Sequence, residues 1–184
     1  MISEILPITE TKLDILSVLY QYTELNLAEI SKKIKISSSN ILKTIPKLIQ
    51  ILNIKKIGNI KLYSINKQYL KEFEPLIESY RINKSLGIHT QLLNKIENIY
   101  QIENMYLFGS FAKEIQNENS DLDLIIITNK KEEVVKEIKI IQKISPFIIE
   151  PLYLTKEEFE KEMKNQNSRF KKIIEDKSLR IKIK

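Results

Sequence analysis

Apolar residues in the first third of the chain recur with the period of amphipathic helices. Their spacing predicts helices over residues 9–22, 26–33 and 39–52, because apolar positions three and four apart form one buried face. Pro46 falls inside the third of these helices and lacks the N–H that the helix needs, so a kink is expected there. Asn53 is expected to end this helix in the left-handed conformation.

Two β-prone runs follow the predicted helices and flank a two-residue loop. The runs are Ile54–Ile57 and Ile60–Ile65, and the loop is Gly58-Asn59. Glycine at the first position of such a loop is typical of a type II′ hairpin turn. The expected order of elements up to residue 66 is therefore helix, helix, helix and hairpin.

The remainder of the chain mixes helical and strand patterns. Residues 67–100 are helical in two segments that break near Ser85, Leu86 and Gly87. Further along, the pattern predicts strands over 106–108, 122–128, 146–154 and 179–183, and helices over 111–114, 131–143 and 169–176, with a short helix capped by Thr155. The chain is therefore expected to be an α+β protein with domains at 1–66 and 101–184, joined by a helical connector at 67–100.

Composition excludes several classes of site. The chain has no cysteine and one histidine, which excludes disulfides, thiol nucleophiles, zinc clusters and iron–sulfur sites. Any metal ligands must therefore be oxygen atoms, which Mg²⁺ or Mn²⁺ prefers. The longest apolar run is four residues, too short to span a bilayer, and residues 1–17 lack the pattern of a signal peptide. We expect a cytoplasmic protein with no membrane partner.

Positive charge is concentrated in the N-terminal part of the chain. Lys and Arg total 30 against 24 Asp and Glu, for a net charge of +6. No acidic residue occurs between Glu29 and Glu72, whereas lysines stand at positions that include 32, 33, 35, 43, 47, 55, 56, 61 and 67. Such a block indicates a polyanionic partner. The alternative is that the lysines only solvate a small helical domain that serves to form a homodimer.

The candidate chemistry follows the first strand of the C-terminal domain. Gly109 and Ser110 form a tight turn from strand to helix, where backbone N–H groups and the serine hydroxyl can bind phosphate, and Lys113 lies one turn further on. Asp121 and Asp123 begin the next strand, and side-chain alternation points both carboxylates to one face. Because two such anions repel, the pattern predicts a divalent cation between them and a bound triphosphate.

This arrangement resembles the signature of the polymerase-β-like nucleotidyltransferase superfamily, in particular its minimal nucleotidyltransferase branch. The matching residues are Gly109, Ser110, Ala112, Lys113, Ser120, Asp121, Asp123 and Leu124. The resemblance implies an α/β domain with a small mixed sheet, in which the two aspartates are catalytic and bind metal, and Gly109, Ser110 and Lys113 bind the nucleotide phosphates. Glu114 stands where the family usually has glycine.

Family members carry a third carboxylate on a neighbouring strand. The helix predicted over 131–143 is a crossover that brings residues 147–154 beside the strand with the two aspartates. Glu150 is the acid that residues 147–154 contain. The resemblance implies that Glu150 is catalytic, as the base that deprotonates the acceptor hydroxyl, and that it shares the metal. The alternative is a strand residue that faces solvent.

The N-terminal helices and hairpin are built from the segments LAEISKKIKISSSNILKTIPKLIQILNI and GNIKLYSIN. Together, over residues 9–66, they resemble the winged helix-turn-helix that is fused to small nucleotidyltransferases in archaea. The resemblance implies that the third helix enters the major groove of DNA and that the hairpin touches the DNA backbone. The implied DNA contacts are Ser38, Ser39, Asn40 and Lys43 to bases, and Lys47, Lys55, Lys56 and Lys61 to phosphates.

Two functions of different classes remain. The first is a magnesium-dependent enzyme that moves AMP from ATP, or a monophosphate from another nucleoside triphosphate, to a hydroxyl. The resemblance implies an antitoxin-like acceptor, a tyrosine of a partner toxin protein, with small molecules such as aminoglycosides as the other precedent. The second is a DNA-binding transcriptional regulator whose nucleotidyltransferase fold only senses nucleotide or docks a partner. Both hold together if the protein represses its own operon while it modifies a partner.

Overall fold

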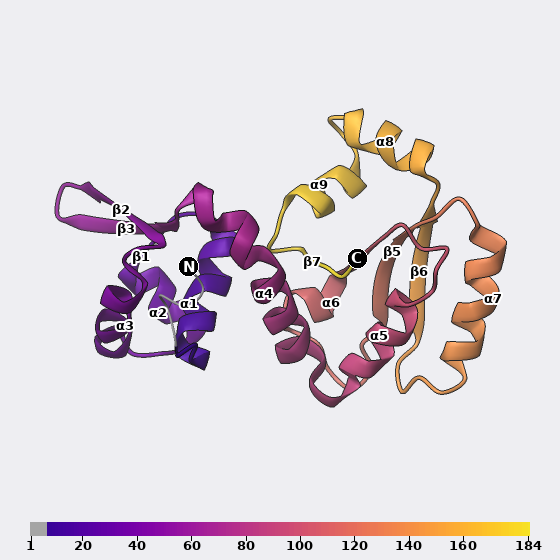
Figure 1. The fold of residues 1–184 in the computed structure, drawn as a ribbon, viewed down its shortest axis with the longest axis horizontal. Coiled ribbons are helices and arrows are strands. Elements are labelled where there is room, and N and C mark those ends of the chain that lie inside the picture. Colours follow the sequence, from indigo (N-terminus) through magenta and orange to yellow (C-terminus); the bar gives the residue numbers. More distant parts are fainter. Residues whose placement is uncertain (1–6) are drawn as a thin grey trace. The chain divides into compact units, whose positions relative to one another are not determined.

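The computed structural model describes residues 7–184, which divide into two compact units after Tyr80 (Figure 1). Helix α4 (Lys67–Leu86) crosses this boundary. Its first part contributes Phe73 and Ile77 to the core of the first unit, and Leu86 belongs to the core of the second. Where the sequence predicts a separate connector over 67–100, the structure therefore divides this segment between the two units.

The first unit combines short helices with a three-stranded antiparallel sheet of strand order β1-β3-β2. Before α4, its elements are α1 (Glu10–Tyr22), β1 (Leu25–Asn26), α2 (Leu27–Ile34), α3 (Ser38–Thr44), the 3-10 helix η2 (Ile45–Leu48), β2 (Leu52–Ile57) and β3 (Ile60–Ile65). The helices begin where the sequence offers capping side chains, since Thr9, Asn26 and Ser37 each accept a hydrogen bond from the first turn that follows.

The structure confirms the hairpin and corrects the third helix. Gly58 has φ +59° between paired Ile57 and Ile60, as a type II′ turn requires. The helix predicted over 39–52 was wrong in extent: α3 ends at Thr44, and the tighter η2 follows because Pro46 cannot donate a helical hydrogen bond. Asn53 was also wrongly assigned, because it lies in β2.

The second unit contains a mixed four-stranded sheet of order β6-β5-β4-β7, in which β5 and β6 are parallel and the other neighbours antiparallel. After α4 its elements are η3 (Gly87–His89), α5 (Thr90–Glu97), β4 (Asn104–Phe108), α6 (Gly109–Ala112), β5 (Leu122–Ile127), α7 (Lys131–Gln142), β6 (Ile149–Leu154), α8 (Lys156–Lys164), α9 (Arg169–Glu175) and β7 (Arg180–Lys182). The predicted α+β class and small mixed sheet are confirmed, as is the crossover that pairs β6 with β5.

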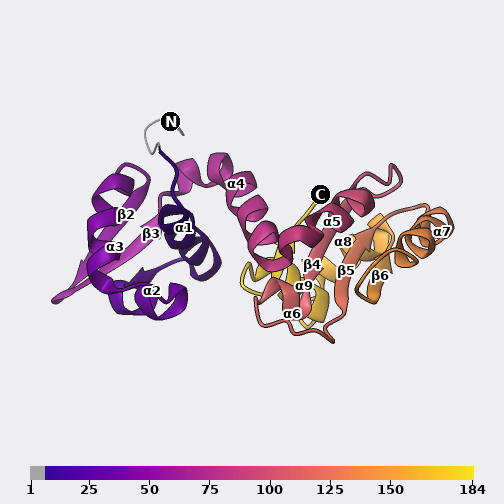
Figure 2. The same ribbon diagram turned by 90° about the horizontal axis from the view of Figure 1, so that it is seen from below.

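Helices cover both faces of this sheet (Figure 2). On one face, residues of α5 and α7 such as Ile96 and Ile138 pack with Leu124 and Ile126 of β5. On the other face, α8 and α9 pack against Tyr106, Ile125 and Ile127. Because residues of β5 alternate between the two faces, Asp123 lies on the face that α9 covers. Within residues 7–184, no helix has both the length and the apolar character needed to cross a membrane.

Candidate functional site

The two strands β5 and β6 place two carboxylates side by side. In their parallel pairing, Asp123 lies directly opposite Glu150, and laterally paired strand residues project from the same face of a sheet. Asp121, two residues before Asp123, shares its side of the chain just before β5 begins. The pattern of β5 predicts the first pair of carboxylates, and the observed register adds Glu150 to that face.

Electrostatic interactions connect the candidate groups. Burial raises the pKa of the Asp123 carboxyl above its ordinary value, the negative charges of Glu150 and Asp121 raise it further, and the positive charge of Lys113 lowers it. Thus Glu150, Asp121 and Lys113, all named from the sequence, act on the Asp123 carboxyl group. A site that concentrates negative charge in this way is suited to bind a cation.

The donor set fits magnesium held jointly by protein and substrate. Within residues 7–184, no group of three or more Asp, Glu, His or Cys side chains is arranged to hold a metal ion. Magnesium is commonly bound through one or two carboxylates together with substrate phosphates, and not by an all-protein cage. Asp121 and Asp123, with oxygen donors only, fit that mode, and Glu150 lies beside them.

The turn after β4 approaches the aspartates through its first residue. Gly109 has φ +70°, and a Cβ atom placed on it would lie 1.9 Å from Oδ2 of Asp123. Only glycine allows this combination of left-handed backbone and close approach. Ser110 follows in the single helical turn of α6, and Lys113, at its end, is exposed. The residues predicted to bind phosphate therefore adjoin the residues predicted to bind metal.

Glu114 occupies a backbone conformation that explains the family's usual glycine. Its φ is +57°, in the left-handed region that side chains disfavour. The carboxylate lies 3.7 Å from Nζ of Lys84 on α4. The turn thus accepts a glutamate where the family usually has glycine, and the glutamate side chain forms an ion pair with Lys84.

A cavity of about 530 Å³ opens beside the carboxylates. It is lined by Phe108, Asp123, Glu150, Pro151, Leu152, Arg169, Phe170 and Ile173. Its walls are mostly apolar, with two carboxylates from the sheet and one arginine from α9. Gly109, Ser110 and Lys113 are not part of its lining, so the cavity and the turn at Gly109 adjoin Asp123 separately.

The sequence predicted a helix over 169–176 but no site residue in it. Arg169 was missed altogether. Its signal is rarity, since arginine occurs in this chain only at positions 81, 169 and 180 among 30 basic residues. Arginine differs from lysine in its planar fork of hydrogen-bond donors, so a rare arginine in a lysine-rich chain is a signal for a candidate site residue.

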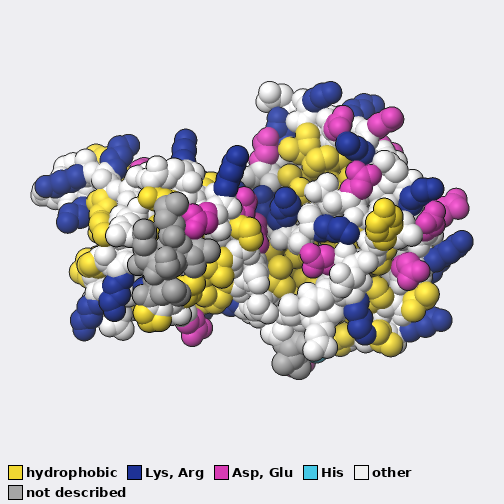
Figure 3. Space-filling model, viewed as in Figure 1, with side chains coloured by type: hydrophobic (Ala, Val, Ile, Leu, Met, Phe, Trp, Pro, Cys, Tyr) yellow, Lys and Arg dark blue, Asp and Glu magenta, His cyan; other side chains and the backbone are white. Residues whose placement is uncertain are grey.

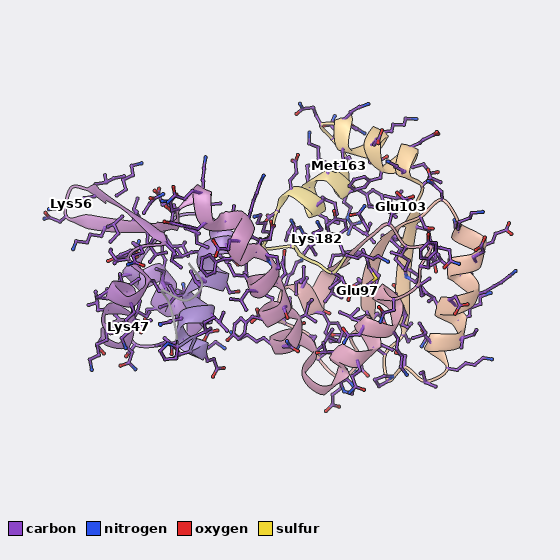
Figure 4. All side chains as sticks on the ribbon, in the orientation of Figure 1. Lys47, Lys56, Glu97, Glu103, Met163 and Lys182 are labelled. Atoms are coloured by element: carbon purple, nitrogen blue, oxygen red, sulfur yellow. The ribbon has the colours of Figure 1, made fainter. Side chains whose placement is uncertain are left out.

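The residues predicted to bind DNA lie on the surface of the first unit. Ser38, Ser39, Asn40 and Lys43 occupy α3, and Lys47 follows in η2; all but the half-buried Ser38 are exposed. Lys61 lies on β3 directly opposite Lys56 of β2. Dark blue side chains gather over the hairpin and α3 in Figure 3, and Figure 4 labels Lys56 near the hairpin tip and Lys47 beside α3.

Neutralising Asp123 is expected to stabilise the second unit when metal is absent. Because folding raises the pKa of this carboxyl, its ionisation at neutral pH opposes folding, and the penalty fades as pH falls toward the ordinary value of 3.8. In buffer with a chelator, Asp123→Asn should melt at a higher temperature than the wild type at neutral pH, with a smaller difference in acid. Differential scanning fluorimetry across pH measures this, and a difference that grows in acid would contradict it.

Comparison with known families agrees with this geometry. A family model described as a nucleotidyltransferase domain matches residues 89–181, about half of the chain. The matched segment contains β4, β5 and β6, the turn at Gly109 and the cavity wall formed by α9. No curated protein matches the chain significantly.

Proposed function

Because the chain belongs to the nucleotidyltransferase domain family, we propose that it is an active, magnesium-dependent or manganese-dependent nucleotidyltransferase that transfers a nucleoside monophosphate from a nucleoside triphosphate to a hydroxyl group. The observation that carries this proposal is the contact between the two parts of the site. The Gly109 backbone lies against Asp123, and Glu150 lies beside Asp123 on the next strand.

Each residue has a definite part in the proposed reaction. Backbone N–H groups of the turn at Gly109 and Ser110, with the Lys113 ammonium, hold the triphosphate oxygens. Asp121 and Asp123 hold Mg²⁺ or Mn²⁺, which when bound stabilises negative charge on the phosphates. The acceptor oxygen bonds to the α-phosphorus, the bond from that phosphorus to the bridging oxygen breaks, and pyrophosphate leaves.

Glu150 is positioned to take the proton of the acceptor hydroxyl. Its side chain is exposed and lines the cavity, whose apolar walls can receive the rest of an acceptor or the nucleoside. A carboxylate in the lining of such a cavity can act as a general base, and the proton passes to one of its oxygens.

Glu150→Gln is expected to lower the transfer rate by about 10²- to 10⁴-fold while leaving the affinity for nucleotide nearly unchanged. The amide keeps the shape of the side chain but cannot accept the proton. Single-turnover rates and nucleotide affinities of the variant give the measurement, and Glu137→Gln on the exposed face of α7 is the matched control. A loss of metal affinity in step with rate would assign Glu150 to the metal; no change in either would leave it a surface residue.

For the donor and acceptor we propose ATP and a hydroxyl of a partner protein, a toxin inactivated by adenylylation, with a small-molecule hydroxyl as the other class. The support is the resemblance of the Gly109–Leu124 segment to the minimal nucleotidyltransferase branch. Incubation with labelled ATP, Mg²⁺ and the product of the neighbouring gene tests this assignment. Label retained on that product after denaturation is the expected result. Label found only on a small molecule would contradict the protein acceptor and assign the acceptor to the small-molecule class.

A second candidate function is DNA binding by the first unit, in which the nucleotidyltransferase fold serves transcription regulation. The observation that favours it is the cross-strand pair Lys56 and Lys61, because like charges directly opposite each other destabilise a sheet unless an anion lies near them. We propose that α3 and the hairpin are the helix and wing of a winged helix-turn-helix that binds duplex DNA, with DNA phosphates as the anion.

The DNA affinity is expected to fall steeply with salt, because each phosphate that a lysine neutralises releases a counterion. Changing Lys43, Lys47 and Lys61 together to glutamine should reduce the log–log salt slope by up to about 2.7, at about 0.9 for each phosphate that is no longer neutralised. Fluorescence anisotropy with the protein's own promoter measures the slope. Glutamine at Lys136, Lys139 and Lys143 of the second unit removes the same charge as a control. Absence of salt-sensitive binding to any duplex would assign the first unit to dimerisation or partner docking.

A further inference from the structure

Arg81 is a completely buried arginine that lines neither the cavity nor the carboxylate cluster. Its guanidinium donates two hydrogen bonds to backbone carbonyls of the second unit. Nη1 donates to the carbonyl oxygen of Arg180 at 2.9 Å, and Nη2 donates to that of Ala112 at 3.3 Å. A cationic side chain buried in this way is costly, and an apolar side chain of similar volume often packs at least as well. The planar donors of a guanidinium suit these two hydrogen bonds to backbone carbonyls.

One of the two carbonyls belongs to the end of the turn that approaches Asp123, and the other belongs to a strand residue that pairs with its beginning. Ala112 is the last residue of α6, which begins at Gly109. Arg180 is paired in the sheet with Phe108, the residue immediately before Gly109. Arg81 thus contacts the end of the turn directly through the carbonyl of Ala112. It contacts the beginning of the turn indirectly, through Arg180 of β7, which pairs with Phe108.

Further contacts from the same part of α4 hold the rest of this segment. Ser85, one helical turn after Arg81, donates its hydroxyl hydrogen to the carbonyl oxygen of Phe111 at 2.6 Å. The amide of Gln116 donates to the carbonyl oxygen of Ser85 at 2.8 Å, and Lys84 forms the ion pair with Glu114. Helix α4 therefore holds the chain from Phe111 to Gln116.

These hydrogen bonds restrain the peptide groups of the turn, because two of them end on the carbonyl oxygens of Phe111 and Ala112. The guanidinium is planar and its N–H donors have fixed directions, so it restrains the carbonyl groups that it binds. Hydrogen bonds that follow one another in a chain also polarise and strengthen one another. Fixed carbonyls leave little freedom to the N–H groups of the same helical turn, which point toward its Gly109 end. The turn is thus held in place from the side opposite to the proposed phosphates.

We propose, on the basis of the proposed function, that Arg81 and Ser85 are positioning residues that hold the Gly109–Ala112 turn in its triphosphate-binding conformation. They act through backbone carbonyls and touch no substrate. Their removal lowers the affinity for the triphosphate part of a nucleotide and spares the affinity for its nucleoside part.

The test compares the affinities of the full chain for ATP with Mg²⁺ and for adenosine. Ser85→Ala is expected to weaken ATP binding by about three- to tenfold, the net effect of one hydrogen bond. Arg81→Met, which keeps the volume, is expected to weaken it by about 10- to 100-fold, since charge-assisted hydrogen bonds are stronger. Adenosine affinity should stay unchanged in both, and Ser85→Thr, which keeps the hydroxyl, should bind ATP as the wild type does.

Ile138→Ala is the control for general destabilisation. Ile138 is buried in the core under α7, so its truncation lowers the melting temperature without touching the turn. It should leave the ratio of ATP to adenosine affinity unchanged. An unchanged ratio in Ser85→Ala would overturn the positioning role even if Arg81→Met fails to fold, as would an equal change in Ile138→Ala. A wild type that binds no ATP would overturn the proposed function, and the positioning role with it.

Discussion

Asp121→Asn and Asp123→Asn are each expected to abolish nucleotide transfer without unfolding the protein. The two carboxylates supply the charge that holds a divalent cation against the triphosphate, and an amide oxygen carries no such charge. Removal of one preorganised electrostatic group commonly lowers a rate by about 10²- to 10³-fold, and loss of a metal ligand is expected to exceed this. Transfer of label from ATP, measured over a range of Mg²⁺ concentrations, tests the loss.

Measurements of thermal stability distinguish the loss of a metal ligand from misfolding of the variants. Mg²⁺ with ATP should raise the melting temperature of the wild type and leave that of Asp123→Asn unchanged, because ligand binding stabilises only the state that binds. Asp176→Asn, the same change at an exposed position at the end of α9, should behave as the wild type. Wild-type transfer rates in both site variants would remove the aspartates from the mechanism.

Gly109→Ala is expected to abolish triphosphate binding together with transfer. The new Cβ would lie 1.9 Å from Oδ2 and 2.8 Å from Cγ of Asp123, so either the turn or the aspartate must move. The substitution also places a side chain at φ +70°, which costs about 1–2 kcal/mol by itself. Both effects displace the groups that hold the phosphates and the cation. Affinity for ATP and thermal stability are the two measurements.

Gly87→Ala introduces backbone strain without a collision, and so separates the two effects of Gly109→Ala. Gly87 has φ +53°, but no atom lies within 4 Å of a Cβ placed on it, so this variant should lose stability and keep its ATP affinity. In the double variant Gly109→Ala with Asp123→Ala, the carboxylate that causes the collision is gone, and part of the lost stability should return. Equal losses of ATP affinity in Gly87→Ala and Gly109→Ala would show that the close approach to Asp123 has no role.

The sequence predicted the parts of the site that depend on neighbours along the chain. Alternation in the strand places Asp121 and Asp123 on one side, and the strand-to-helix transition places Gly109 in a turn. The same local logic located the hairpin turn at Gly58. It failed between residues 45 and 53, where the apolar spacing continued to favour a helix although Pro46 had already made one unfavourable.

The tertiary structure decided which distant residues share the site. The register of β6 on β5 placed Glu150 opposite Asp123, and a shift of one residue would have turned it to the other face. Packing of α9 on the sheet added Arg169 to the cavity, and α4 brought Arg81 to the turn. Periodicity along a chain specifies the face on which a side chain lies; which faces meet depends on how the elements pack together and satisfy their hydrogen bonds in three dimensions.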